Sequence, residues 1–225
     1  MVTPEVKEFF STNKVLLGSS SKWRRKVMEQ QGMPIFGGMS PDIDEDAIRD
    51  PDPSKLCGMI ARVSLWGKRD ELVKRLGEKK GPEGFDCGFV ICSDQVAFCN
   101  GEIREKPKNR EEHLRWLSDY GDKGHPVTTF TAVTVFHWPS GVTASGIDRA
   151  SVHFKSIPDD AKQKLADTEM LYTCSGGFAI DIPEMSSFIE RIDGDEDSVM
   201  GLPVRLLGKL LLQCEKEQKK DEGGT

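Results

Sequence analysis

The chain has 225 residues, of which 31 are Lys or Arg and 37 are Asp or Glu, so its formal net charge is −6. This acidic balance, with no broad basic stretch, argues against binding to nucleic acid, which needs a basic face. The length suits one compact α/β unit with two lobes around a cleft, and we expect residues 1–214 to form it.

The cysteine and hydropathy patterns concern the compartment in which the protein works. The six cysteines show no paired zinc spacing, so we expect reduced thiols with structural roles. The sequence shows neither the pattern of a signal peptide nor an apolar stretch of membrane-spanning length. We therefore expect a cytoplasmic protein without a membrane partner.

The N-terminal part of the chain predicts a strand, a turn and a helix in succession. Residues 15–17 are a short apolar run, residues 18–21 are Gly-Ser-Ser-Ser, and a helical pattern runs from Lys22 to a stop at Gly32. Residues 40–53 are acidic and contain three prolines, which predicts a loop. An amphipathic helix is expected over residues 56–76.

The remainder alternates strand and helix patterns, interrupted by hairpins. Residues 89–92 predict a buried strand that ends at Ser93-Asp94-Gln95, and Asn100-Gly101 predicts a hairpin turn. The other expected elements are a helix opened by Pro107, paired strands over 127–138 and 142–155, a helix over 158–168, a strand over 186–192 and a helix over 204–214. The charged residues 215–225 are expected to be disordered. This order predicts an α/β fold with a mixed central sheet and flanking helices.

Several polar residues are candidates for binding phosphate. Backbone N–H groups at a helix N-terminus, beside the hydroxyls of Ser19 and Ser21, suit a phosphate. Arg24, one turn later, can add charge-assisted hydrogen bonds. The alternative is an ordinary serine-capped helix with a solvated arginine. Lys106, just ahead of Pro107, is either a further phosphate ligand or an ordinary surface lysine.

Two carboxylates are candidates for a metal site. Asp94 follows an apolar strand, where open α/β sheets place ligand-binding residues, so it can hold a divalent metal or deprotonate a water. Glu45 lies in the acidic loop, and carboxylate oxygens suit magnesium or manganese. The alternatives are a turn aspartate and a solvated loop. Trp23, beside the serines, is a candidate for stacking on a base or a half-buried packing residue.

The order and spacing of these segments resemble the Maf family of nucleoside triphosphate pyrophosphatases. The resemblance is carried by residues 17–25 (Leu-Gly-Ser-Ser-Ser-Lys-Trp-Arg-Arg), 40–45, 92–95, 105–107, 188–194 and 199–203. It implies a fold similar to the inosine-triphosphate pyrophosphatases, hydrolysis between the α and β phosphates, a divalent cofactor (Mg²⁺ or Mn²⁺), and a homodimer as the candidate assembly. The implied catalytic residues are Asp94, Glu45 and Lys106, with Asp94 and Glu45 at the metal and Ser19, Ser21 and Arg24 at the phosphates.

Two positions depart from the family pattern. Lys22 replaces the usual proline before Trp23, and Ser64 stands where the family has a lysine. Lys68 lies four residues further on, hence on the same face of the expected helix, and is a candidate to contact the phosphates instead.

The base-specificity positions are Trp23, Gln95 and Asp181. They resemble the branch acting on 7-methyl-GTP, which has Trp-Arg-Arg and Ser-Asp-Gln and a glutamate aligning with Asp181. N7-methylated guanine is cationic, so stacking on Trp23 would gain roughly 0.5–2 kcal/mol, and Asp181 can accept from its Watson–Crick edge. Two alternatives stay open: a dTTP/UTP pyrophosphatase of the same family, and a nucleotide-binding regulator of cell division.

Overall fold

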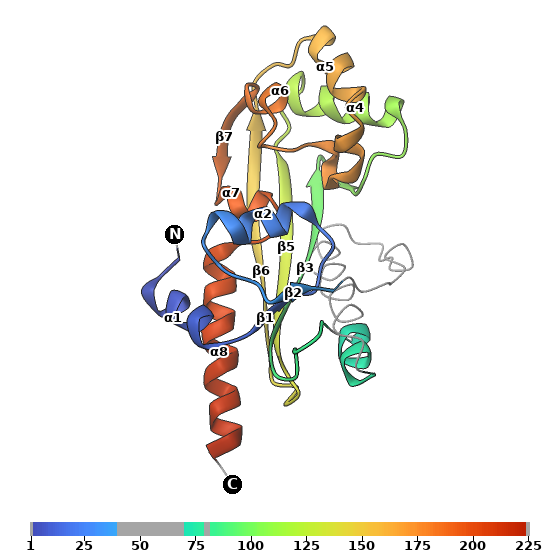
Figure 1. Cartoon of the computed structure of the whole chain (residues 1–225). Coiled ribbons are helices and arrows are strands. Elements are labelled where there is room, and N and C mark those ends of the chain that lie inside the picture. Colours follow the sequence, from blue (N-terminus) through green and yellow to red (C-terminus); the bar gives the residue numbers. More distant parts are fainter. Residues whose placement is uncertain (1, 40–69, 79–81, 224–225) are drawn as a thin grey trace.

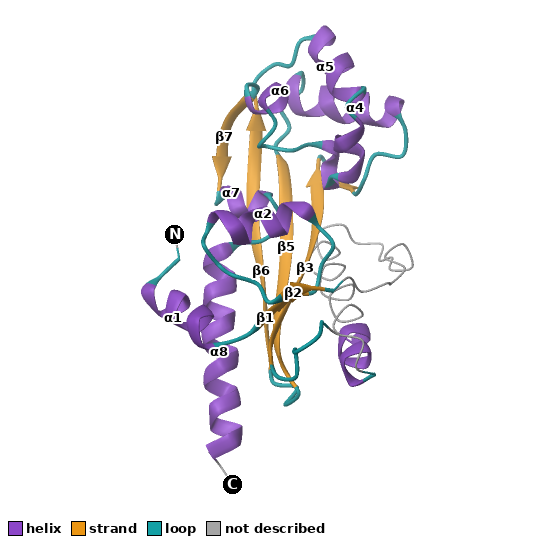
Figure 2. Ribbon diagram, in the orientation of Figure 1, coloured by secondary structure: helices purple, strands orange, loops and turns teal. Residues whose placement is uncertain are grey.

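The computed structural model describes residues 2–39, 70–78 and 82–223, and it shows a mixed sheet flanked by helices (Figures 1 and 2). The sheet has seven strands in the order β2-β1-β3-β5-β6-β7, with β4 paired to β3 outside this path. β1 is parallel to β2 and β3, whereas the other pairs are antiparallel. The predicted mixed α/β sheet is confirmed. The strands are β1 Val15–Leu17, β2 Gly37–Gly38, β3 Gly88–Cys99, β4 Glu102–Arg104, β5 Val127–Trp138, β6 Thr143–Phe154 and β7 Ile189–Asp193.

The helices cover the sheet in separate groups. They are α1 Pro4–Thr12, α2 Lys22–Gln30, α4 Arg110–Gly121, α5 Asp159–Ala166, α6 Pro183–Ser186, α7 Glu196–Val199 and α8 Val204–Gly223, with 3₁₀ turns η2 Glu169–Thr173 and η3 Ser175–Gly177. Residues 70–77 are also helical. Within the described ranges, no helix combines the length and apolarity that crossing a membrane requires. The cysteines in these ranges are free thiols, and all but Cys87 are buried.

Different hydrophobic clusters support the two ends of the sheet. One cluster joins α1 and α8 to β1 and the first half of β3, through residues such as Phe9, Leu17 and Leu207. Another joins α4 and α5 to the far ends of the long strands, with Trp116 and Phe154 among its members. In Figure 1, α4, α5 and α6 lie together at the upper end, away from α1 and the C-terminal end of α8. The division into two lobes around a cleft stays a prediction from the sequence.

Strand β3 is longer than the sequence pattern predicted. We expected a strand over residues 89–92 that ended at Ser93-Asp94-Gln95, but β3 runs without interruption from Gly88 to Cys99. The reason is that β5 pairs with almost its whole length, and this ladder holds polar residues in extended conformation as firmly as apolar ones. β1 stops earlier, at Leu17 opposite Ile91. Asp94 therefore lies inside a strand, just beyond the carboxyl end of the parallel partner.

Some boundaries also differ from our predictions. Residues 215–223 were expected to be disordered, but they continue α8. Interactions between side chains four residues apart stabilise this part of the helix. In one of them, Lys219 Nζ lies 2.8 Å from Glu215 Oε1. Helix α4 begins at Arg110 and not at Pro107, because the Asn109 side chain caps it.

Candidate active site

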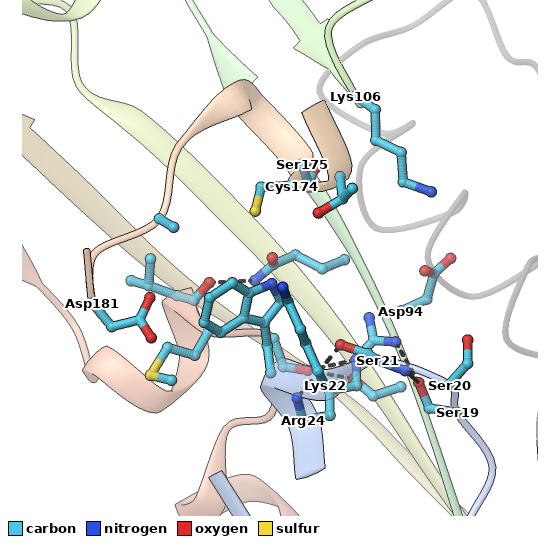
Figure 3. Close-up of a pocket in the computed structure, with 18 of the residues that line it drawn as sticks. Ser19, Ser20, Ser21, Lys22, Arg24, Asp94, Lys106, Cys174, Ser175 and Asp181 are labelled. Atoms are coloured by element: carbon cyan, nitrogen blue, oxygen red, sulfur yellow. Dashed lines mark hydrogen bonds between the residues drawn. The ribbon is translucent and has the colours of Figure 1, made fainter. Parts of the chain in front are cut away.

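A pocket of about 490 Å³ lies beside α2 (Figure 3). This volume is typical of sites for small ligands. The pocket is lined by residues 18–24, 93–95, 106, 173–175, 178–181 and 199–201. Segments far apart in the sequence therefore meet in one cavity, at the carboxyl end of β1.

Each predicted site residue that the structure describes lines this pocket. These residues are Ser19, Ser21, Trp23, Arg24, Asp94, Gln95, Lys106 and Asp181. The predicted residues Glu45 and Lys68 lie outside the described ranges, as do the acidic loop and Ser64.

The loop between β1 and α2 is held close to β3. The Gly18 N–H donates to the Ile91 carbonyl at 2.7 Å. Ser21 caps α2, its hydroxyl accepting from the Arg24 N–H, and its own N–H donates to Ser19 Oγ at 3.1 Å. The serine cap and the phosphate-binding role are thus compatible, because capping occupies a single hydroxyl and leaves other groups of the helix N-terminus for an anion.

The close approach of this loop to β3 requires glycine at position 18. A Cβ there would lie 2.5 Å from Leu72 Cδ1 and 3.1 Å from the Ile91 carbonyl oxygen. We expect Gly18→Ala to lower the free energy of unfolding by about 1–3 kcal/mol, as overpacking of a filled interior does. Urea denaturation measures this change. Gly77→Ala is the matched control, because its Cβ would meet nothing nearer than 3.8 Å; a loss of similar size there would contradict the account.

Arg24 connects the serine loop to the turn that follows α7. Its Nη1 donates to Ser19 Oγ at 3.1 Å, and its Nε donates to the Gly201 carbonyl, also at 3.1 Å. Ser93 Oγ donates to the same carbonyl at 2.9 Å. The guanidinium is consequently oriented before any ligand binds, which lowers the entropic cost of binding an anion.

Gln95 forms hydrogen bonds with the end of α7, just before the same turn. Its Nε2 lies 2.8 Å from the Ser198 carbonyl, 3.0 Å from the Val199 carbonyl and 2.9 Å from Thr131 Oγ1. These acceptors orient the amide nitrogen toward α7. Gln95 therefore shapes this wall of the pocket in addition to the base-specificity role that we predicted.

Asp94 and Lys106 lie at the serine end of the pocket. Asp94 is 9% exposed, on the β3 segment that runs past the loop. In Figure 3, Asp94 lies between Lys106 and the serines Ser19 and Ser20. A carboxylate flanked by hydroxyls and a cation can hold a divalent metal or accept a proton from water.

A buried network supports the segment that carries Lys106. Arg104 is 1% exposed and forms ion pairs with Asp119 and with Glu102. The Arg104 carbonyl accepts from Ser175 Oγ, whose oxygen also accepts from the Ala97 N–H. The sequence showed no signal for this network, because an arginine in a short strand is usually solvent-exposed.

The opposite end of the pocket carries an aromatic ring and several charges. Lys22 Nζ and Lys26 Nζ lie 5.0 Å and 5.7 Å from the centroid of the Trp23 ring. Lys26 Nζ also lies 2.6 Å from Asp181 Oδ2. Burial raises the pKa of the Cys174 thiol, although hydrogen bonds with Thr173 and Trp23 and the charge of Lys22 oppose this shift. These contacts make this end suitable for a planar polar group.

The described part of the pocket contains a carboxylate, that of Asp94, which fits a divalent ion shared with a ligand. Among the described residues, no cluster of three or more His, Cys, Asp or Glu side chains could hold a metal. Mg²⁺ commonly uses one or two carboxylates together with phosphate oxygens and waters. Asp94 supplies one such carboxylate beside the serine loop.

Comparisons with known proteins identify the family of this chain. The family model of Maf-like proteins matches residues 14–214. A 7-methyl-GTP pyrophosphatase of Dictyostelium discoideum is 38% identical over 200 residues, covering 88% of this chain and 96% of that protein. One from Pseudoalteromonas translucida is 32% identical over 203 residues, covering 88% and 91%. A dTTP/UTP pyrophosphatase of Treponema denticola is 28% identical over 204 residues, covering 89% and 97%. The match over nearly the whole chain shows that the protein belongs to the family of Maf-like proteins.

Proposed function

We propose that the protein is a nucleoside triphosphate pyrophosphatase, which converts a nucleoside triphosphate and water into the monophosphate and pyrophosphate. The observation that carries this proposal is the placement of Asp94 beside cationic and hydroxyl groups in the same pocket as the Trp23 ring. Asp94 with the cationic and hydroxyl groups suits the triphosphate, and the Trp23 ring suits the base. The names of the relatives support the same activity.

In this proposal the pocket residues have distinct roles in the hydrolysis of the triphosphate. Asp94 orients or deprotonates the water that attacks the α-phosphorus. Arg24 and Lys106 stabilise the charge that develops on the leaving pyrophosphate, and Ser19 and Ser21 bind phosphate oxygens. Asp94 and Glu45 would hold Mg²⁺ or Mn²⁺, which neutralises phosphate charge when bound. Lys68 stays a prediction as a further phosphate ligand.

We propose 7-methyl-GTP, or a similarly modified purine nucleotide, as the preferred substrate. Trp23 is half-buried and lines the pocket, so its ring is accessible to a stacked base. A cationic base gains a cation–π interaction that a neutral base lacks. The Treponema relative supports the alternative of dTTP and UTP as substrates. We also propose that the protein works in the cytoplasm and forms a homodimer.

Replacement of Trp23 tests the stacking interaction. We expect Trp23→Arg to lower kcat/KM for 7-methyl-GTP about 5- to 30-fold, because the aromatic surface and its cation–π term are lost together. Turnover of UTP should change less. Trp23→Phe is the matched control, since it keeps an aromatic face and should lose less than the arginine variant. Equal losses for 7-methyl-GTP and UTP would contradict base stacking on Trp23.

A substrate panel tests the proposed function. Pyrophosphate release is measured with 7-methyl-GTP, GTP, dTTP and UTP, with Mg²⁺ or Mn²⁺ and after addition of EDTA. We expect metal-dependent release that is fastest with 7-methyl-GTP. Fastest release with UTP or dTTP would favour the pyrimidine alternative. Tight nucleotide binding without turnover would favour the regulatory role.

A further inference from the structure

Lys26 does not line the pocket itself, but its ammonium group contacts two side chains that do, at the end of the pocket where we expect the base to bind. Its Nζ lies 2.6 Å from Asp181 Oδ2 and 5.7 Å from the centroid of the Trp23 ring. Trp23 and Lys26 are three residues apart on α2, so their side chains lie on one face of the helix. Asp181 reaches them from the segment that follows η3.

These contacts are the same two that a cationic base would use. A methylated purine stacked on Trp23 would place its positive charge on the ring, and its Watson–Crick edge would donate to Asp181. The Lys26 ammonium already supplies a positive charge to both groups. A cationic base must therefore compete with Lys26, and the carboxylate that attracts it is already neutralised.

We propose that Lys26 is a specificity-determining residue, which limits how strongly the pocket prefers a cationic over a neutral purine by pairing with Asp181. This inference rests on the proposed function. The expected size of the change in selectivity follows from the exposure of the ion pair, because the Lys26 and Asp181 side chains are 42% and 18% exposed. Ion pairs of this kind are weak, so displacement of Lys26 changes selectivity by about two- to fivefold rather than by orders of magnitude.

Lys26→Met tests the proposal, because methionine keeps an unbranched apolar chain beside the Trp23 ring and removes only the ammonium. We expect the ratio of kcat/KM for 7-methyl-GTP to that for GTP to rise about two- to fivefold. The change should appear as a lower KM for 7-methyl-GTP with little change in kcat, as expected for uniform binding of ground state and transition state.

Two further variants separate this effect from a general change in charge. In an Asp181→Asn background, Lys26→Met should raise the ratio clearly less, because the carboxylate that Lys26 neutralises is gone and only the contact with the Trp23 ring remains. Lys74→Met removes a lysine that pairs with Glu71 at 3.8 Å and not with a residue of the pocket, and it should leave the ratio unchanged. If Lys26→Met does not fold, as judged by thermal unfolding, Lys26→Gln provides the same loss of charge with a polar side chain.

The native enzyme is assayed first with both nucleotides. No pyrophosphate from either would overturn the proposed preference for a modified purine nucleotide, and this inference with it. Turnover of both nucleotides, with a ratio that stays constant or falls in Lys26→Met, would overturn the role of Lys26 alone. A rise of the same size in the Asp181→Asn background would also overturn it, because the effect would then not pass through Asp181.

Discussion

Asp94→Asn is expected to lower kcat for pyrophosphate release at least about 100-fold, the usual loss on removal of a general base. Asparagine has nearly the same size as aspartate, and the β3 backbone at this position is paired with Ala132 of β5. The fold should therefore survive the substitution. An amide neither accepts the proton of the attacking water nor supplies a negative charge to a divalent ion.

The measurement is pyrophosphate release at saturating nucleotide and metal, together with thermal unfolding of the same sample. Asp148→Asn is the matched control, because Asp148 lies on β6, which is separated from β3 by β5, and does not line the pocket. Its rate should stay within about twofold of the native rate, as for surface substitutions away from a site. A nearly native rate for Asp94→Asn would remove Asp94 from the mechanism.

Asp119→Asn is expected to lower the free energy of unfolding by about 3 kcal/mol, because breaking a buried ion pair leaves an uncompensated charge. Its partner Arg104 is 1% exposed and lies over the rings of Trp116 and Tyr120. Glu102 remains as a second partner at 3.1 Å, which keeps the loss at the lower end of the usual range. Asp160→Asn is the control: this side chain is 76% exposed, so the change should be below about 0.5 kcal/mol.

The Asp119 pair also predicts a dependence of stability on pH. Burial alone would raise the pKa of Asp119, but hydrogen bonds from Lys123 and Arg104 outweigh this effect and hold the pKa below its ordinary value of 3.8. The unfolded state then binds a proton at a higher pH than the folded state. The contribution of Asp119 is thus complete above its ordinary pKa and is lost as the pH falls below it.

Urea denaturation of the native protein and Asp119→Asn at neutral pH and at about pH 3 tests this sign. The difference in stability should shrink at the acidic pH. A constant difference would contradict the lowered pKa of Asp119.

Since the Arg104 carbonyl and Ser175 are hydrogen-bonded, loss of this network should also reduce turnover by displacing the segment that carries Lys106.

The parts of the fold that depend on neighbouring residues were predicted from the sequence. The strand over residues 15–17, the serine turn and the helix that starts at Lys22 follow from apolar periodicity and capping, which act within a few residues. The hairpin at Asn100-Gly101 likewise follows from local turn chemistry, since both residues have positive φ.

The features that were missed depend on pairing that the apolar pattern and the composition do not reveal. The uninterrupted course of β3 through Asp94 results from its ladder with β5, which no local pattern around residues 93–95 contains. The helical residues 215–223 depend on pairs along α8 and on a hydrogen bond between Asn13 and Glu215. The tail composition alone resembled that of a disordered segment.

The candidate site shows the same division. Asp94, Arg24 and Lys106 were chosen from residue type, position after or before an element, and family resemblance, and the structure places them in one pocket. The pairing of Lys26 with Asp181 joins residues 155 positions apart, so it follows only from the folded arrangement. Candidate catalytic and binding residues can therefore be proposed from the sequence, whereas the residues that they contact are seen only in the three-dimensional structure.

Hydrolysis of 7-methyl-GTP in H₂¹⁸O with Mg²⁺ tests the central claim most directly, because mass spectrometry of the products shows which phosphorus the water attacked. Attack on the α-phosphorus predicts 7-methyl-GMP that carries one ¹⁸O atom, together with unlabelled pyrophosphate. Label in pyrophosphate, release of orthophosphate with 7-methyl-GDP, or absence of turnover with every nucleotide of the panel would contradict the account.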